Sequence, residues 1–206
     1  MEKSRQELLF DTALEEFAAG YDHANTNRIC EKAGVSKGLL FHYYGSKKEL
    51  YEKVIDHCVD DVILSFQSFT VEGLSFVDAL LAYSRQKCAF YLSHPYHYTI
   101  LNEAFLFPPV DVMDSMRKKY YCMESIGRQI MSGLLDKIVL RKGINREVVL
   151  SFLVSTSCAT DMLFDEGDIR GKELSETIYT KVESRYLEVI DLVLHGIGTE
   201  KNELII

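Results

Sequence analysis

Cationic side chains are concentrated in one short stretch of this sequence, between residues 26 and 48. The stretch contains one acid, Glu31, and five bases: Arg28, Lys32, Lys37, Lys47 and Lys48. Its net charge is therefore +4, and because the whole chain carries −8, the remainder carries −12. Lysine and arginine neutralise the phosphate groups of nucleic acids. This asymmetry predicts a short segment that faces phosphates and an acidic body that phosphates repel.

Patterns typical of enzymes and metal sites are not found in the sequence. It has no H-E-x-x-H or E-x-x-H metal pair, no P-loop, no G-x-G-x-x-G loop and no G-x-S-x-G elbow. His94 and His97 are three residues apart, but Pro95 between them favours a helix start, and no third ligand is evident. We therefore expect no catalytic site, no metal and no cofactor.

The five cysteines and the N-terminal residues indicate the cellular compartment. Cys30, Cys58, Cys88, Cys122 and Cys158 have no paired spacing, so we expect buried, unreactive thiols rather than disulfides or a zinc site. The first sixteen residues mix charged and apolar positions, unlike a signal peptide, and no apolar run of about 18 residues occurs. These features predict a cytoplasmic protein without a membrane segment.

Helical spacing of apolar residues dominates the N-terminal part of the chain. A first helix is expected from a capping box of Ser4 and Glu7 to about Gly20. Asn25 or Thr26 can cap a second helix that ends at Ala33. Gly34 then permits a tight turn. The second helix and this turn, followed by a third helix that Ser36 can cap, form a helix-turn-helix pattern.

Capping residues define the next two helices in the same way. Ser36 can cap a third helix that Gly45 ends, and Ser46 with Glu49 forms another capping box. The fourth helix is expected to extend to about Phe69. Five further helices are predicted near 73–93, 95–107, 110–141, 145–166 and 172–196, separated by prolines, glycines and a polar stretch. The fold is therefore predicted to be all-α, with about nine helices.

The stretch from Thr26 to Leu50, TNRICEKAGVSKGLLFHYYGSKKEL, resembles the DNA-binding segment of the TetR family of transcription regulators. It has the capping threonine, the I-x-x-x-A-G-V-S turn, the S-K-G start of the recognition helix and the S-K-x-E-L opening of the next helix. With the upstream helix, the resemblance covers about the first quarter of the chain. It implies a DNA-binding domain over residues 1–48 and a ligand-sensing and dimerisation domain over residues 49–206.

The residues that this resemblance places on DNA fall into two groups. Those expected at base edges are Lys37, Gly38, Leu39 and His42, assisted by Asn27 and Arg28, and those expected on phosphates are Thr26, Tyr43 and Lys47. Independently of the resemblance, helical spacing turns Ile29, Val35, Leu40 and Tyr44 inward, toward Leu14 and Phe17, and leaves the predicted base-contacting side outward.

Three positions depart from the family pattern. Phe41 stands where tyrosine is frequent, which removes one phosphate-donating hydroxyl. Gly45 replaces a common proline, and Cys30 replaces a small alanine.

Two other functions are possible for this sequence: an all-helical enzyme that uses Glu103, Glu124 or Asp161, and a module that binds only protein. Steep salt dependence of DNA binding would distinguish the regulator from both.

The last two predicted helices are expected to form a homodimer interface, as the resemblance implies. Ser151, Ser155 and Ala159 recur every four residues and would let helices approach closely, beside Phe152, Thr156 and Leu163. The final helix carries an apolar seam of Leu174, Ile178, Val182, Tyr186, Val189 and Val193. The alternative is that this seam packs only within one chain.

Aromatic residues in the middle helices indicate a small-molecule effector. Tyrosine combines an apolar ring with a polar hydroxyl, which suits the wall of a ligand pocket. The predicted ligand-binding residues are Tyr91, Tyr98, Glu103, Phe105, Tyr120, Tyr121, Met123 and Phe152. The carboxylates of Glu103 and Asp161 would be costly to bury alone, so each either pairs internally or meets a ligand. The expected function is a repressor released from a palindromic double-stranded DNA operator by a hydrophobic or aromatic inducer.

Overall fold

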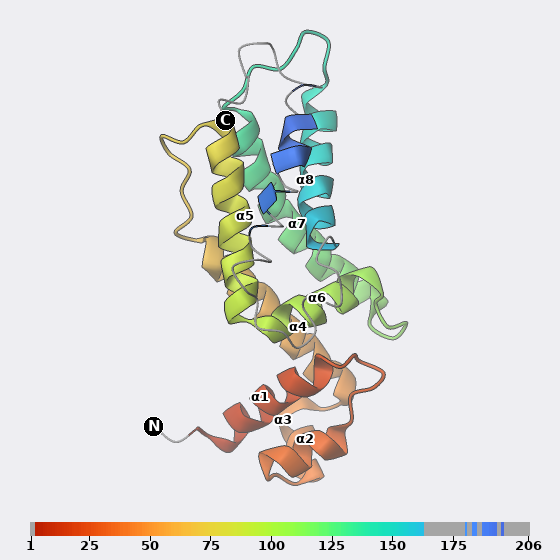
Figure 1. Ribbon diagram of the computed structural model, residues 1–206. Helices are drawn as coiled ribbons and strands as arrows, with labels where there is room; N and C mark the ends of the chain where they lie inside the picture. The colour runs from red at the N-terminus through yellow and green to blue at the C-terminus, as the bar shows by residue number, and fades with distance from the viewer. Residues whose placement is uncertain (1–2, 163–179, 181–182, 185–186, 193–194, 196–206) are drawn as a thin grey trace. The chain divides into compact units, whose positions relative to one another are not determined.

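The computed structural model describes residues 3–162, 180, 183–184, 187–192 and 195, with the backbone alone for 158–162. This part of the chain contains eight continuous helices and no β-strand (Figure 1). The helices are α1 (Arg5–Phe17), α2 (Thr26–Ala33), α3 (Lys37–Tyr44), α4 (Lys47–Phe66), α5 (Phe76–Ser93), α6 (Pro95–Leu106), α7 (Met113–Leu135) and α8 (Arg146–Met162). The described residues between 180 and 195 are all helical as well. The all-α prediction is confirmed, and none of the described helices has the length and apolarity needed to span a bilayer.

Two compact units make up the chain. The first comprises Met1–Leu64 and Ser93–Met123, and the second comprises Ser65–Leu92 and Glu124–Ile206. The predicted boundary at residue 48 separates two functions, DNA binding and ligand sensing, and it stays a prediction. The first unit therefore holds most of α4, all of α6 and the start of α7 in addition to the helices of the predicted DNA-binding domain.

Capping residues set the bounds of the first helices as predicted. The Ser4 hydroxyl accepts a hydrogen bond from the Glu7 amide while the Glu7 carboxylate accepts one from the Ser4 amide. The side chains of Asn25 and Ser36 cap α2 and α3 in the same manner. Gly34 ends α2 with a φ of +63°, which glycine adopts without a Cβ penalty.

Three of the later helix ends that differ from prediction have identifiable reasons. Helix α5 begins at Phe76 rather than 73, because the Ser75 hydroxyl caps the Asp78 amide at 3.1 Å. Helix α4 ends at Phe66, and the Phe69 amide donates to the Phe66 carbonyl in a tight turn instead. Helix α7 ends at Leu135 rather than 141. The prediction was too long because the apolar pattern continues past the helix, where residues 138 and 140 pack on the core from a loop.

Each unit buries its own apolar side chains. In the first unit, the fully buried large side chains come from α1 to α4, α6 and α7: Leu9, Phe17, Ile29, Leu40, Leu50, Tyr51, Ile55, Ile100 and Met116. In the second unit, α5, α7 and α8 contribute Leu80, Met131, Leu134, Leu150 and Leu153, joined by Ile190 (Figure 1). Val189 also packs on this core, and the rest of the predicted C-terminal seam lies outside the described residues.

The cysteines only partly follow the prediction of buried thiols. Cys30 and Cys58 are buried, and burial raises the pKa of Cys58 to about 12, which keeps it protonated and unreactive. Cys88 is half-buried, and the expectation is wrong for Cys122, which is exposed on α7. Cys122 lies in an apolar run from Tyr120 to Met123, and such a run does not indicate which of its side chains faces solvent.

Two buried tyrosines of the first unit differ in how their hydroxyls are satisfied. The Tyr21 hydroxyl donates to Asp111 Oδ2 at 2.8 Å, whereas the Tyr51 hydroxyl has no partner among the described residues. We expect Tyr51→Phe to keep or raise the free energy of unfolding by up to about 1 kcal/mol, because it removes an unsatisfied buried hydroxyl. The matched Tyr21→Phe variant should lose about 1 kcal/mol. Urea unfolding of both variants measures this, and equal losses would contradict it.

Candidate nucleic-acid interface

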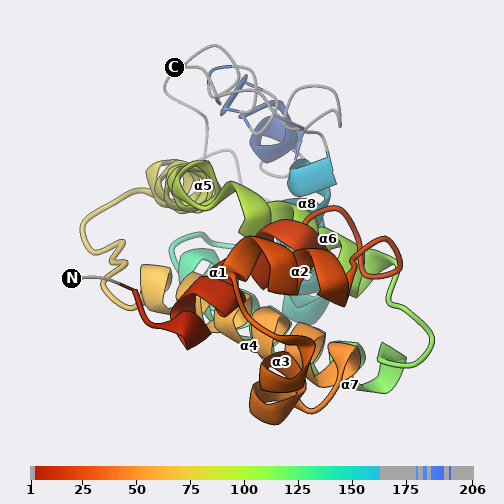
Figure 2. The ribbon, with the colours of Figure 1, turned by 90° about the horizontal axis from the view of Figure 1, so that it is seen from below.

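The helix-turn-helix is formed by α2, the turn at Gly34 and α3 (Figure 2). The Val35 amide donates to the Cys30 carbonyl at 3.0 Å, which closes the end of α2. Ser36 then starts α3 immediately, through hydrogen bonds from the Leu39 amide to its carbonyl and hydroxyl. The turn is therefore fixed by short-range hydrogen bonds between neighbouring residues, and it sets the direction of α3.

Burial within this unit follows the predicted inward and outward faces. Ile29 and Leu40 are completely buried, and Val35 and Tyr44 are half-buried. Among the predicted DNA-contacting residues the exposed ones are Asn27, Arg28, Lys37, Gly38, His42 and Tyr43, and the half-buried ones are Thr26, Leu39 and Lys47. One side of α3 thus presents a lysine, a glycine, a histidine and a tyrosine to solvent.

Arg28 has an internal role that the sequence did not indicate. Its guanidinium donates to Glu16 Oε1 on α1 and to the His23 carbonyl, at 2.7 and 2.8 Å. The Asn25 amide donates to the same Glu16 oxygen at 2.9 Å. Burial raises the pKa of the Glu16 carboxyl, but these hydrogen bonds outweigh it and hold the pKa below its usual value. Arg28 therefore ties α1 to the start of α2, and its predicted contact with base edges would compete with this ion pair.

A γ-turn joins α3 to α4. Gly45 has φ +69° and ψ −59°, and the Ser46 amide donates across it to the Tyr44 carbonyl at 2.7 Å. Ser46 then caps α4 by accepting from the Glu49 amide at 3.1 Å. The connection is so short that Tyr43 and Lys47, the two predicted phosphate-binding residues on its sides, are held close along the chain.

The lysines that follow this turn are positioned by the α1–α2 and α6–α7 loops. The Lys47 ammonium lies 4.6 Å from the centre of the Tyr21 ring, a cation–π contact. The Lys48 ammonium donates to the Asp111 carbonyl at 2.6 Å. Tyr21 itself donates through its amide to Glu103 Oε1 at 3.1 Å. Lys47 is thus pre-oriented, while Lys48 is engaged within the protein.

The predicted ligand-binding residues are divided between the two units. Tyr98, Glu103, Phe105, Tyr120, Tyr121 and Met123 belong to the first unit, whereas Tyr91 and Phe152 belong to the second. Phe105 contacts Tyr120, with ring centres 5.5 Å apart, and Tyr120 contacts Tyr121. Tyr121 is 64% exposed and Phe152 is 52% exposed. Glu103 has an internal partner in the Tyr21 amide, one of the two alternatives considered for it, and the Asp161 side chain lies outside the described residues.

Sequence reasoning missed one cluster of polar side chains in the first unit. His97 on α6 meets Asp61 and His57 of α4, and His97 is buried although its neighbour His94 is only half-buried. Burial lowers the pKa of His97, despite the opposing hydrogen bond with Asp61. The available signal was the four-residue spacing of His57 and Asp61, which puts both on one helix face. Nothing in the sequence indicated that α6 would bring His97 to that face.

Comparisons with known proteins agree with this architecture. Residues 9–54 match the family model described as bacterial regulatory proteins, tetR family. A curated relative, the HTH-type transcriptional repressor SCO4008 of Streptomyces coelicolor, is 33% identical over 76 residues, which are 36% of this chain and 40% of that protein. The match thus spans less than half of the relative's length.

Solved structures match over nearly the whole chain. A TetR family transcriptional regulator from Chloroflexus aurantiacus has a TM-score of 0.70 at 19% identity, covering 97% of this chain and 96% of that one. The regulator FadR from Bacillus subtilis, in complex with stearoyl-CoA, has a TM-score of 0.67 at 15% identity, covering 93% and 98%. These similarities establish the fold, and the family-model match identifies the N-terminal domain. Residues 9–54 are thus identified as the N-terminal segment of the tetR family of bacterial regulatory proteins, in a chain that has the fold of the solved TetR-family regulators.

Proposed function

We propose that this protein is a transcriptional repressor that binds a near-palindromic DNA operator as a homodimer and is released by a small hydrophobic or aromatic effector. The outward side of α3, with Lys37, Gly38, His42 and Tyr43 exposed while Leu40 is buried, supports it most. An α-helix fits the major groove, where such side chains reach base edges. The family match favours this function over the enzyme and protein-binding alternatives, and the relative SCO4008 is named a repressor.

Lysine variants test the DNA contacts. We expect Lys47→Ala to weaken binding to all DNA sequences and to reduce the slope of log affinity against log salt by about one, because one phosphate contact is lost. Lys37→Ala should also relax base preference. Gel-shift titration at several salt concentrations, on fragments selected from genomic DNA, measures both. Lys53→Ala, an exposed lysine further along α4, is the control. An unchanged slope in Lys47→Ala would contradict the phosphate contact.

The exposed face of α8 supports the proposed dimer. Val148 and Phe152 are 65% and 52% exposed, and Ser151 and Ser155 lie exposed on the same side of the helix. Small residues beside large apolar ones allow two helices to pack closely and bury the apolar area. Because Phe152 lies on this stripe, its exposure favours the dimer interface over the ligand pocket for this residue.

An arginine on this stripe tests the dimer. Ser155→Arg should convert the protein to monomers and strongly lower operator affinity, because a large charge would be buried between the helices. Light scattering measures the mass in solution. Ser68→Arg, at an exposed turn after α4, is the control and should remain dimeric. A dimeric Ser155→Arg protein would place the interface elsewhere.

The effector is proposed from the aromatic side chains around α6 and α7. Phe105 and Tyr120 form an aromatic pair, and Tyr98 is half-buried on α6. FadR, which has the same fold, is solved with a bound acyl-CoA. A ligand that favours the conformation unable to bind DNA weakens operator binding by the factor by which DNA weakens ligand binding. A thermal-shift screen of apolar compounds tests the model, which fails if stabilising compounds leave operator affinity unchanged.

A further inference from the structure

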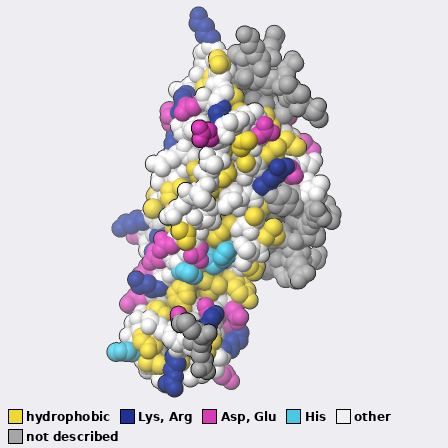
Figure 3. All heavy atoms as spheres, turned by 90° about the vertical axis from the view of Figure 1, so that its left-hand side faces the viewer, with side chains coloured by type: hydrophobic (Ala, Val, Ile, Leu, Met, Phe, Trp, Pro, Cys, Tyr) yellow, Lys and Arg dark blue, Asp and Glu magenta, His cyan; other side chains and the backbone are white. Residues whose placement is uncertain are grey.

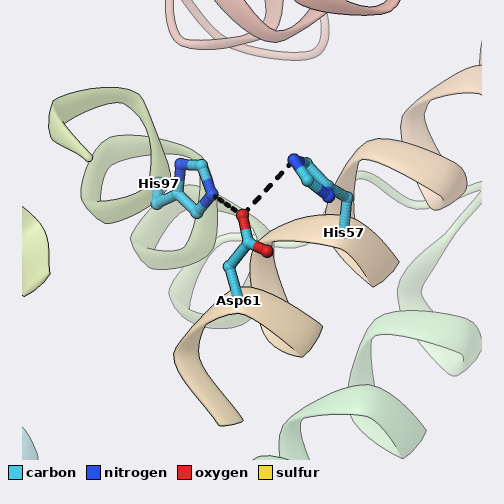
Figure 4. A group of neighbouring side chains, drawn as sticks. All are labelled: His57, Asp61 and His97. Atoms are coloured by element: carbon cyan, nitrogen blue, oxygen red, sulfur yellow. Dashed lines mark hydrogen bonds and ion pairs between the residues drawn. The ribbon is translucent and has the colours of Figure 1, made fainter. Parts of the chain in front are cut away.

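Two helices of the first unit bring together two imidazoles and a carboxylate. His57 and Asp61 lie one turn apart on α4, and His97 projects toward them from α6 (Figure 4). The Asp61 Oδ2 atom lies 2.9 Å from His97 Nε2 and 3.3 Å from His57 Nε2. One ligand atom from each residue lies within 4.8 Å of the other two. Three groups that bind metals thus converge on one point.

The distances between these atoms suit a common metal ion. Zinc binds histidine nitrogen and carboxylate oxygen at about 2.0–2.1 Å. Two such ligands are about 2.9 Å apart at a right angle and about 3.4 Å apart at a tetrahedral angle. The two separations that involve Asp61 fall in this range, and the ligand atoms of the two histidines lie within 4.8 Å of each other, so an ion could bind all three residues if the imidazoles turned toward it. The donor set of two imidazoles and one carboxylate suits zinc, cobalt, nickel or iron, whereas calcium and magnesium prefer oxygen alone.

The cluster has one buried residue and one exposed residue, so its metal-binding atoms are both held in place and accessible to solvent. The His97 side chain is 5% exposed and is held within α6, whereas the His57 side chain is 45% exposed. Figure 3 shows histidine side chains adjoining acidic side chains on one face of the molecule. An ion could therefore reach the cluster from solvent, and water could complete its coordination.

We propose that His57, Asp61 and His97 form a binding site for one divalent first-row transition-metal ion, represented by Zn²⁺. The ligands are Nε2 of each histidine and a carboxylate oxygen of Asp61. Binding displaces to solvent any proton carried on these two nitrogens, and each imidazole keeps a proton on Nδ1. The site links α4 to α6 within the first unit.

The cluster also contacts the helices that carry the proposed DNA interface. The His57 ring packs edge-on against Phe10 of α1, with centres 5.1 Å apart, and Phe10 lies 6.4 Å from the ring of Tyr44 on α3. A metal ion that draws His57 toward Asp61 and His97 acts directly on this contact. Its occupancy should therefore change operator affinity, an extension that rests on the proposed function.

Metal binding is tested on the full-length protein. Metal-free protein titrated with Co²⁺ should form a one-to-one complex with visible d–d absorption, which Zn²⁺ displaces, and Zn²⁺ should raise the Tm. His57→Ala and Asp61→Asn should each weaken Zn²⁺ binding at least tenfold and abolish the Tm increase. Because the His57 side chain is 45% exposed rather than in the core, its alanine variant should fold.

A second histidine–aspartate pair provides the control. His195 and Asp191 are also four residues apart, with Nδ1 and Oδ1 separated by 3.1 Å, and both are exposed. His195→Ala should bind Zn²⁺ like the unmodified protein. If no Co²⁺ complex forms, or if His57→Ala binds Zn²⁺ as tightly as the unmodified protein, the metal site is overturned.

The coupling to DNA has a separate readout. Operator titrations with and without Zn²⁺ should differ at least threefold in Kd for the unmodified protein and coincide for His57→Ala. If Zn²⁺ binds at the cluster while Kd stays constant, the coupling is overturned and the site stands. If no DNA is bound under any condition, the proposed function fails and the coupling fails with it, whereas the Co²⁺ and Tm results still decide the metal site.

Discussion

Gly45→Pro is expected to lower the free energy of unfolding by about 3 kcal/mol or more and to abolish operator binding. Proline fixes φ near −65°, whereas the γ-turn at Gly45 needs φ +69°. Proline also removes the amide that donates to the Phe41 carbonyl at 2.9 Å. Any Cβ here would meet Glu49 Oε2 at 2.5 Å, so the capping carboxylate must move as well. Urea unfolding and gel-shift titration measure the two effects.

Gly45→Ala separates these causes. Alanine keeps the amide, so it should lose only the cost of the positive φ and of displacing the Glu49 carboxylate, about 1–2 kcal/mol. The comparison has particular interest because proline is common at this position among the proteins that the segment resembles. A Gly45→Pro protein as stable as the original would mean that α3 and α4 can be joined by a different turn.

Glu16→Gln is expected to lower the free energy of unfolding by about 2 kcal/mol at neutral pH, because it removes the buried charge that accepts from Arg28 and the Asn25 amide. The pKa of Glu16 is lowered in the folded protein. The stabilisation from this ionisation is therefore complete above the ordinary carboxyl pKa of 4.5 and is lost as the pH falls through the lowered value. The difference between the two proteins should shrink accordingly in acid.

Glu15→Gln is the matched control for this prediction. Glu15 is the adjacent residue, half exposed, and lies 3.4 Å from the exposed Lys32 ammonium. Such surface pairs contribute between about 0 and 1 kcal/mol. Urea unfolding of all three proteins from pH 7 to pH 3 gives the comparison. A Glu16→Gln difference that stays constant with pH would show that packing, rather than charge, makes Glu16 important.

The parts of this fold that sequence could predict are those determined by neighbouring residues. Ser4, Asn25 and Ser36 each cap a helix through a side chain that reaches an amide two or three residues away. Gly34 and Gly45 take up the positive φ angles that end α2 and α3. The faces of α3 followed from the same short-range periodicity. Each of these signals involves residues within about one helical turn of each other, so it can be recognised from the sequence alone.

Contacts between distant segments were not predictable in this way. The partner of Arg28 is Glu16, twelve residues earlier, and the partner of the Tyr21 amide is Glu103, 82 residues later. Charge and spacing allow many such pairings, and the packing of α6 selects one. The predicted end of α7 was wrong for a related reason: in the sequence, apolar residues that cover a core from a loop resemble the continuation of a helix.

The two bonds to Asp111 determine which part of the chain could be transplanted. The Asp111 carboxylate accepts a hydrogen bond from the Tyr21 hydroxyl, and its carbonyl accepts one from the Lys48 ammonium. The Glu103 carboxylate accepts a third hydrogen bond, from the Tyr21 amide. A chimaera that grafts residues 1–48 onto another sensor domain would lose all three acceptors. The part of the chain that keeps these three bonds is therefore discontinuous, and includes residues 93–123 with the N-terminal helices. Hybrid regulators built from this chain should therefore carry residues 93–123 together with the N-terminal helices.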